Sequence, residues 1–307
     1  MFLNEIDPKP VKPITSHPMY TVDVFAEEKY TGNQLAVFRN ASDLTTETMQ
    51  RIAREMNYSE TTFILSDEPW NEGYDVRIFT PEGELPFAGH PTLGTAYVIL
   101  SEIIDTPVDR VTLNLKIGRI PVSVREENGN RLLWMEQRPP MFGRTFEPAE
   151  VAPIIGLEPK DIDPQLPVQE VSTGLPFVIV PIRPEGGLRR AKRDPDAFEA
   201  FAKKYGKDMI YMFSAKPRDP KNHLAVRMFT RFVTMPEDPA TGSACGCLGG
   251  YLVEHGYMGE ESIDLRVEQG YEMGRPSLLR LSSCRKSGTI RVCVGGRVIM
   301  VSRGHLL

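Results

Sequence analysis

The chain of 307 residues contains little cysteine and no long apolar run. Its four cysteines form no CxxC pair, and Cys245 and Cys247 are too close together for a zinc ribbon. The five histidines are scattered, so we expect no metal site. No apolar segment is long enough to cross a bilayer, and residues 1–18, which prolines interrupt, are interpreted as a flexible leader. These absences predict a cytoplasmic protein that does not bind membranes.

The net charge of the chain is also small. The formal net charge is −5 and charged residues make up 25% of the chain, which gives no indication of a nucleic-acid surface. The basic run at 188–193 is better interpreted as a solvated face. The hydrophobic content of 41% is ordinary for a globular protein, and the length favours two domains.

Apolar periodicity predicts both helices and strands. Residues 45–57 carry Met49, Ile52, Ala53 and Met56 on one helical face, with Thr45 or Thr46 as the cap. The segments 91–104 and 242–256 are apolar nearly all round, which indicates helices buried on every side. Alternating segments such as 19–27 predict strands between them. The fold class is therefore α+β.

An internal repeat is the strongest sign of organisation. "VRIFT" begins at Val76 and "VRMFT" at Val226, and each is followed by an acidic residue, a glycine and a buried helix. With a longer second connection, Glu84 matches Asp238 and Ala88 matches Gly242. Chance remains an alternative to duplication for so few matching residues.

Duplication predicts two pseudo-equivalent halves. Each would be a curved, mostly antiparallel, barrel-like sheet around a central helix, because a buried helix needs strands to wrap it. We place the halves at 19–128 and 129–307, the first completed by strand residues from the C-terminus. The N-termini of the two helices would then face each other across a cleft.

The two helix starts predict an anion site. Unpaired N–H groups and the helix dipole favour a negative charge, and Gly89 and Gly242 allow a ligand to approach the backbone closely, next to Ser243. Neither start carries a dinucleotide or phosphate-loop motif, so we expect no cofactor and a carboxylate as the ligand. Ordinary helix capping by Gly242–Ser243 is an equally good interpretation.

Three further residues are candidates for acid–base chemistry. His90 at the first helix start would be neutral and able to exchange a proton, although a polar tip at a helix end explains it as well. Asp238 either belongs to the site or stabilises a helix dipole. Glu60 precedes the apolar "TTFIL", where desolvation would raise its pKa; a surface acid is the alternative.

Several motifs together resemble one family. The segments "MNYSETTFIL", "FTPEGELPFAGHPTLGTAYVI", "STGLPFVIVPI" and "EDPATGSACG" are similar, in this order, to the phenazine-biosynthesis PhzF-like proteins. The likeness runs from about Tyr20 to the C-terminus. It implies the diaminopimelate epimerase fold, with two similar halves and the site between them, and it implies a homodimer.

The resemblance also implies roles for single residues. Glu60 matches the catalytic acid/base of the family, and His90, Asp238 and Ser243 match its other polar site residues. Related epimerases and proline racemases carry paired cysteines at the helix starts, where this sequence has Ala88 and Gly242. A two-thiol mechanism is therefore not expected.

The resulting hypothesis is a cofactor-independent isomerase of a small carboxylic acid. The resemblance makes trans-2,3-dihydro-3-hydroxyanthranilate, a cyclic amino- and hydroxy-substituted acid, one candidate substrate. The alternative is a non-catalytic metabolite-binding or protein-interaction module that has kept the fold, although all four polar positions are retained.

Overall fold

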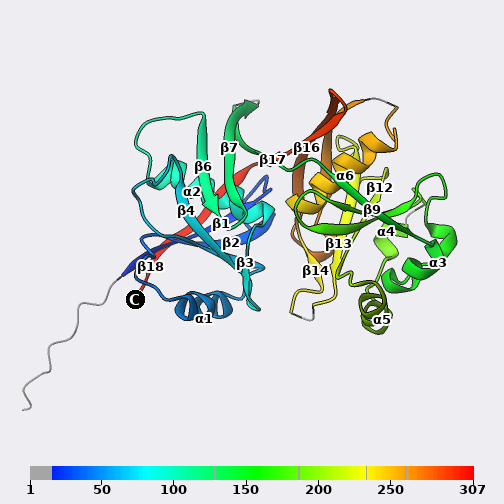
Figure 1. The fold of residues 1–307 in the computed structure, drawn as a ribbon, viewed down its shortest axis with the longest axis horizontal. Coiled ribbons are helices and arrows are strands. Elements are labelled where there is room, and N and C mark those ends of the chain that lie inside the picture. Colours follow the sequence, from blue (N-terminus) through cyan, green and yellow to red (C-terminus); the bar gives the residue numbers. More distant parts are fainter. Residues whose placement is uncertain (1–15, 128, 186, 233, 260) are drawn as a thin grey trace, which may run out of the picture.

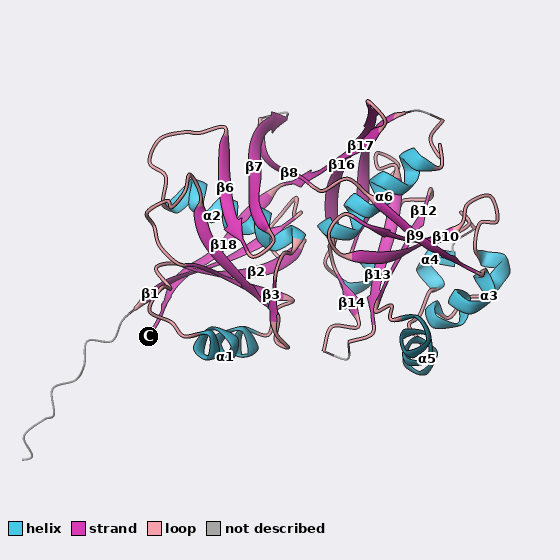
Figure 2. Cartoon of the chain, in the orientation of Figure 1, coloured by secondary structure: helices cyan, strands magenta, loops and turns pink. Residues whose placement is uncertain are grey.

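A computed structural model describes residues 16–127, 129–185, 187–232, 234–259 and 261–307. The architecture is mixed α+β, with many strands and few helices (Figures 1 and 2). The strands are β1 (His17–Val24), β2 (Asn33–Phe38), β3 (Glu60–Ile64), β4 (Tyr74–Phe79), β5 (Glu84–Leu85), β6 (Arg110–Leu115), β7 (Gly118–Glu127), β8 (Asn130–Glu136), β9 (Met141–Phe146), β10 (Val168–Ser172), β11 (Pro176–Pro181), β12 (Met209–Ser214), β13 (Leu224–Thr230), β14 (Glu237–Asp238), β15 (Ser262–Gln269), β16 (Ser277–Lys286), β17 (Thr289–Gly296) and β18 (Val298–Leu306).

The helices are α1 (Thr46–Met56), α2 (Gly89–Glu102), α3 (Pro148–Val151), α4 (Gly187–Arg190), α5 (Pro195–Tyr205) and α6 (Gly242–Glu254). Short 3₁₀ turns cover Ala152–Ile155, Pro159–Asp161 and Tyr271–Met273. Among the described residues, none of the helices combines the length and the apolar character that crossing a bilayer requires.

The strands pair in the same order when the sheet is followed inward from either edge. From one edge the order is β18, β1, β2, β3, β4, β6, β7, β8, and β8 then pairs with β17. From the other edge it is β9, β10, β11, β12, β13, β15, β16, β17. The parallel pairs fall at matching places: β2 with β3 and β11 with β12, and then β4 with β6 and β13 with β15. Most other neighbours are antiparallel, as expected for a curved sheet of this kind.

Helices α2 and α6 are buried, as their composition predicts. α2 lies against β1, β2, β3 and β6, and α6 lies against β10, β11, β16 and β17. Small residues let the strands come close: a side chain at Gly94 would meet Leu35, and one at Gly249 would meet Leu281. Because both helices are surrounded by strands, the main apolar core forms around them.

Local signals place the other helices. α1 begins after Thr45, whose hydroxyl accepts a hydrogen bond from the Thr48 N–H, and its buried side contains Met49 and Ala53. This confirms the helix expected at 45–57. α5 begins after Asp194, which caps it in the same way. Both helices lie outside the main core, over smaller clusters of apolar side chains.

Some boundaries differ from the expectations. Of the expected leader, His17 and Pro18 belong to β1, which pairs with β18, and residues 1–15 lie outside the described residues. The expected domain boundary near residue 128 falls in the antiparallel pair β7–β8. The division of the chain into two domains stays a prediction.

The register of the repeat also needs correction. In the ladders, Phe79 pairs with Glu84, whereas Phe229 pairs with Glu237. Glu84 therefore corresponds to Glu237 and not to Asp238. The motif match made the second connection one residue too long. It did so because Glu237 and Asp238 are both acidic, so either could be matched with Glu84.

An arginine–glutamate pair joins the two strands at each of these places. Arg77 donates to both carboxylate oxygens of Glu84, at 2.8 Å each. Arg227 does the same to Glu237, also at 2.8 Å each, and its third nitrogen donates to backbone carbonyls of Leu188 and Ala191. Arg227 is 6% exposed, so its charge depends on this partner.

We expect Glu237→Gln to lower the free energy of unfolding by about 2–3 kcal/mol, because it leaves the buried Arg227 with only the more distant carboxylate of Glu272, at 3.9 Å. Urea denaturation of wild type and variant measures the effect. The control is Glu136→Gln, which breaks a bidentate pair with Arg291 that is about half exposed on both sides, and a much smaller change is expected there. Equal changes in the two variants would contradict the role assigned to the buried pair.

Candidate active site

The N-termini of α2 and α6 meet in the middle of the molecule. A Cβ placed on Gly89 would lie 2.8 Å from the backbone nitrogen of Ser243, so only glycine allows this approach. Neither helix has a side-chain hydrogen bond at its N-cap, which is Ala88 in α2 and Thr241 in α6. The capping alternative for Gly242–Ser243 therefore does not describe this helix start.

A cavity of about 370 Å³ adjoins the two helix starts. Its polar lining contains four carboxylates, from Glu60, Glu82, Glu84 and Asp238. Of the described residues that line it, none is lysine, arginine or histidine. The remaining lining residues are Thr80, Gly83, Leu85, Ala88, Gly89, Leu175, Phe177, Met209, Met228, Phe232, Met235, Thr241 and Ser243.

Glu60 lies at the start of β3 and faces His90. The distance from Glu60 Oε2 to His90 Nε2 is 3.4 Å. Both atoms are buried, and neither has a hydrogen-bond partner that meets ordinary geometry. Glu60 Oε2 and His90 Nε2 are therefore buried polar atoms that face each other without an ordinary hydrogen bond, which is unusual in a folded protein.

Burial disfavours the charged form of both groups. Desolvation, together with the negative charges of Asp238 and Glu82, raises the pKa of Glu60 well above its ordinary value. Desolvation also lowers the pKa of His90 to about 3. A carboxyl group with a raised pKa is a stronger base once it is ionised, which suits proton abstraction near neutral pH.

Asp238 is buried and densely hydrogen-bonded. Its carboxylate accepts from Asn33 Nδ2 at 2.8 Å, from Thr241 Oγ1 at 2.5 Å and from Ser59 Oγ at 3.4 Å. Burial raises the pKa of Asp238 to about 6, although these donors act in the opposite direction. Its side chain is thus fixed in position while its charge is costly.

The structure does not bring every predicted residue to the cavity. Glu60, Asp238, Ser243 and Gly89 line it, whereas His90 lies behind Glu60 and does not. Gly242 is also absent from the lining, because it packs against the ring of Phe25.

The cysteines take no part in the described site. Cys245 and Cys247 are buried in α6, and desolvation raises the pKa of Cys247 to about 11. Their thiols lie in the apolar core and not in the cavity lining.

Sequence reasoning missed Asn33. This buried amide donates to Asp238 Oδ1 and to the carbonyl of Ala240, at 2.8 and 2.9 Å, and it lies 3.2 Å from His90 Nδ1. It therefore links β2 to both catalytic candidates and to the strand that precedes α6. Nothing in the local sequence pattern showed that this asparagine would point across the molecule.

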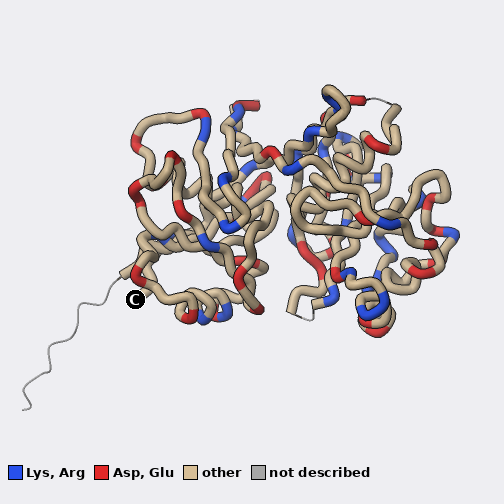
Figure 3. The backbone as a smooth tube through the Cα atoms, in the orientation of Figure 1, with Lys and Arg blue, Asp and Glu red and all other residues tan. Residues whose placement is uncertain are grey.

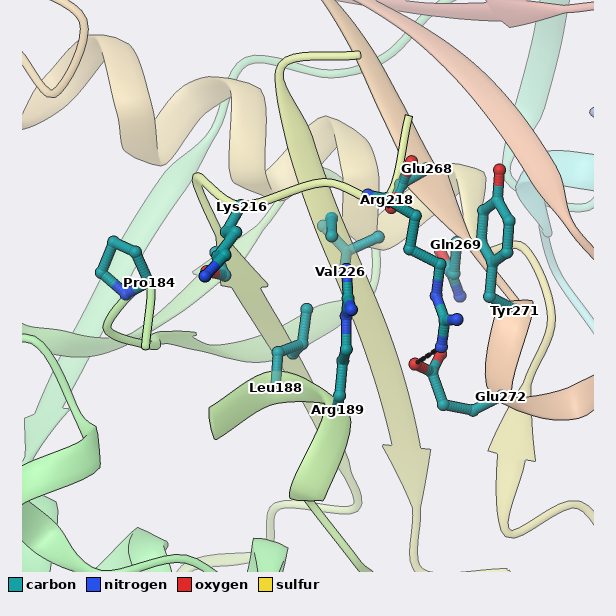
Figure 4. Close-up of a pocket in the computed structure, with 12 residues that line it drawn as sticks. Pro184, Leu188, Arg189, Lys216, Arg218, Val226, Glu268, Gln269, Tyr271 and Glu272 are labelled. Carbon is teal, nitrogen blue, oxygen red and sulfur yellow. Dashed lines mark hydrogen bonds and ion pairs between the residues drawn. The ribbon is translucent and has the colours of Figure 1, made fainter. Parts of the chain in front are cut away.

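Gln269 supports the same carboxylate from behind. Its amide donates to the backbone carbonyl of Asp238 and accepts from the N–H of Thr241. Figure 4 shows Gln269 among the residues of a separate pocket of about 70 Å³. That pocket is far smaller than ordinary ligand sites, and Arg218 within it already pairs with Glu272.

A family model described as "Phenazine biosynthesis-like protein" matches residues 22–304. The chain belongs to this family. A trans-2,3-dihydro-3-hydroxyanthranilate isomerase of Pseudomonas aeruginosa is 34% identical over 298 residues, which are 92% of this chain and all of the relative. An uncharacterized isomerase of Clostridium acetobutylicum is 31% identical over 96% of this chain and 99% of its own length. These relatives identify the chain as an isomerase-type enzyme.

Solved structures agree with the family assignment. A phenazine biosynthesis protein of the PhzF family from Bacillus anthracis has a TM-score of 0.87 and 29% identity, covering 96% of this chain and all of that one. A probable proline racemase from Agrobacterium radiobacter has a TM-score of 0.62 at 10% identity, over 95% of this chain and 93% of that one, and so shares the fold alone.

The raised pKa of Asp238 predicts a pH dependence of stability. Between about pH 4 and pH 6 the folded state holds a proton that the unfolded state has released, so this group makes the protein less stable as the pH rises through that window. Asp238→Asn should therefore flatten the decline in unfolding free energy from pH 4 to pH 7, even if it weakens the fold at every pH. Urea titrations at several pH values test this, with the exposed Asp105→Asn as the control. An unchanged slope in Asp238→Asn would contradict the assignment.

Proposed function

We propose that the protein is a cofactor-independent isomerase that moves a proton on a small carboxylic acid. The observation that carries this proposal is the meeting of two uncapped helix N-termini beside a cavity that also contains Glu60. The helix starts supply a site for a carboxylate, and Glu60 supplies a base within the same cavity. The family assignment supports the reaction class.

The substrate carboxylate would lie at Gly89 and Ser243. No cationic side chain is present among the described lining residues, so backbone N–H groups and the helix dipoles must provide the positive potential. The Ser243 hydroxyl adds a further donor. Gly242, which packs on Phe25, would support this subsite from behind without contacting the ligand.

Proton transfer would use one carboxyl group twice. Ionised Glu60 takes a proton from an activated carbon, and the electron pair left on that carbon spreads into the conjugated system of the substrate. The same carboxyl then returns its proton to another carbon of that system, which shifts the double bond and restores ionised Glu60. The net reaction is an isomerisation that consumes no cofactor.

His90 and Asp238 would act from different sides. His90 contacts Glu60 Oε2 and does not line the cavity. We therefore assign His90 two roles: it positions the Glu60 carboxyl group and exchanges a proton with it. Asp238 lines the cavity, where it can accept a hydrogen bond from a hydroxyl or amino group of the substrate. Its orientation is set by Asn33 and Thr241.

The acidic lining favours a substrate that also carries an amino group. Glu84 is paired with Arg77 and Lys116, but Glu82 has only a hydroxyl, that of Thr234, as its described partner. An ammonium group in the cavity would give Glu82 a counter-charge. The substrate named for the Pseudomonas aeruginosa relative is one candidate of this kind.

We also propose that the chain arose by internal duplication into two pseudo-equivalent halves. The matching order of strand pairings and the two arginine–glutamate pairs support this hypothesis. The homodimer and the cytoplasmic location implied by the sequence stay predictions. The alternative function, a binding module without catalysis, makes the opposite forecast in the exchange experiment below.

We expect Glu60→Gln to lower solvent-deuterium incorporation into trans-2,3-dihydro-3-hydroxyanthranilate by about a hundredfold or more, since it removes the general base. The assay is mass spectrometry of the acid in deuterated buffer without added metal or cofactor. Glu55→Gln, exposed on α1, is the control. Exchange as fast as wild type in Glu60→Gln would exclude Glu60 as the base, and binding without any exchange in wild type would favour the binding module.

Gly89→Ala should abolish carboxylate binding, because its Cβ would occupy the space beside the Ser243 nitrogen. Isothermal titration with benzoate measures the affinity. Gly83→Ala is a matched control: Gly83 lines the same cavity, but a Cβ there meets nothing within 4 Å. If both variants bind benzoate like wild type, the carboxylate does not lie between the helix starts.

A further inference from the structure

We infer that the substrate has a bulky apolar body beyond its carboxylate, which the enzyme recognises through a wall rich in methionine and phenylalanine. This inference rests on the proposed function, because it takes the carboxylate subsite at Gly89 and Ser243 as the fixed end of the ligand. The other end is then defined by what lines the rest of the cavity.

The apolar wall comes from one part of the chain. It is formed by side chains near the ends of β11, β12 and β13 and in the loop after β13, namely Leu175, Phe177, Met209, Met228, Phe232 and Met235. These elements lie on the same side of the molecule as α6, whereas β3, which begins at Glu60, lies on the opposite side (Figure 1). Of the four carboxylates, Asp238 lies beside the apolar wall, because β14 pairs it with Met228, and the other three come from β3 and from the segment between β4 and α2.

Part of the apolar wall is exposed to solvent in the structure. Phe177 and Met228 form the buried part of this wall. Phe232, by contrast, is 39% exposed, one of the few large apolar side chains that reach solvent among the described residues. An aromatic ring at the edge of a cavity loses contact with water when an apolar ligand covers it, which favours binding.

The size of the cavity agrees with a bulky ligand. A volume of about 370 Å³ is within the range of pockets that hold whole cofactors or drug-sized molecules. An acid with only a few carbons would leave the methionine wall in contact with water. A ligand with one or two rings would cover it.

Methionine gives the wall a particular selectivity. Its unbranched, polarisable side chain adapts to different shapes and contacts aromatic rings favourably. Three methionines in one wall therefore make the site tolerant of the outline of the apolar body but intolerant of polar groups there, because the wall offers them no strong hydrogen-bond partner.

The test compares three acids with the same carboxylate: acetate, benzoate and naphthalene-2-carboxylate. Isothermal titration should show that affinity rises from acetate to naphthalene-2-carboxylate, with about tenfold between the last two, since the second ring buries further apolar surface. Met209→Gln and Phe232→Gln should remove most of that gain, weaken benzoate binding less, and leave acetate binding nearly unchanged. Neither side chain is fully buried, so both variants are expected to fold.

The matched control is Met273→Gln. Met273 is 39% exposed like Phe232 but lines a neighbouring pocket and not this cavity, so its replacement should change none of the three affinities. Thermal unfolding of each variant checks the fold. Gly89→Ala reports whether the acids bind at the helix starts.

The outcomes separate this inference from the proposed function. Equal affinities for benzoate and naphthalene-2-carboxylate, both lost in Gly89→Ala, would overturn the apolar wall and leave the carboxylate subsite standing. The same holds if Met209→Gln and Phe232→Gln behave as Met273→Gln does. Binding that Gly89→Ala does not affect, or no binding of any acid, would overturn the proposed function together with the inference.

Discussion

The contact between Gly89 and the backbone nitrogen of Ser243 is the constraint on which the site depends. Two helices can meet at their N-termini only if side chains are absent there, and like dipole ends repel unless a negative charge lies between them. Each of these helices is surrounded by strands, so neither end can move away to relieve the repulsion. The two helix starts therefore place a positive potential at one point, which the proposed substrate carboxylate would offset.

The buried acids around that point supply negative charge when they are ionised, opposite in sign to the potential of the helix starts. Glu60 and Asp238 are both desolvated, and each raises the energetic cost of ionising the other. Such groups would weaken the protein if they had only a structural purpose. Asp238 is kept in place by neutral donors, Asn33 and Thr241, and not by a cation. A neutral setting preserves its basicity, which a lysine or arginine partner would remove.

The helices α2 and α6 and their N-termini could be predicted from the sequence. Their all-round apolar character and their small residues identify them without knowledge of distant contacts. The sequence also pointed to Glu60 and Asp238, but through the family resemblance, because their neighbours along the chain left a surface acid and a dipole-stabilising residue as alternatives. The role of Asn33 could not be predicted, since Asp238 and Ala240, which accept its hydrogen bonds, lie more than 200 residues away. For the same reason the position of His90 behind Glu60, and the register of Glu84 against Glu237, required the three-dimensional pairing. Local pattern predicts which groups are unusual, and only the fold decides which of them face each other.

The pairing of β18 with β1 has a consequence for the synthesis of the protein. β1 is made first and needs β18, which follows every other described strand in the chain, to cover its outer edge. On the ribosome, the sheet around α2 therefore waits with an open edge until nearly the whole chain has emerged. Such an edge pairs readily with other chains, and closing it late is slow because the contact spans almost the full sequence. The edge of β1 therefore stays open to such pairing until β18 has been made, whereas a sheet completed by strands near β1 in the chain would close sooner.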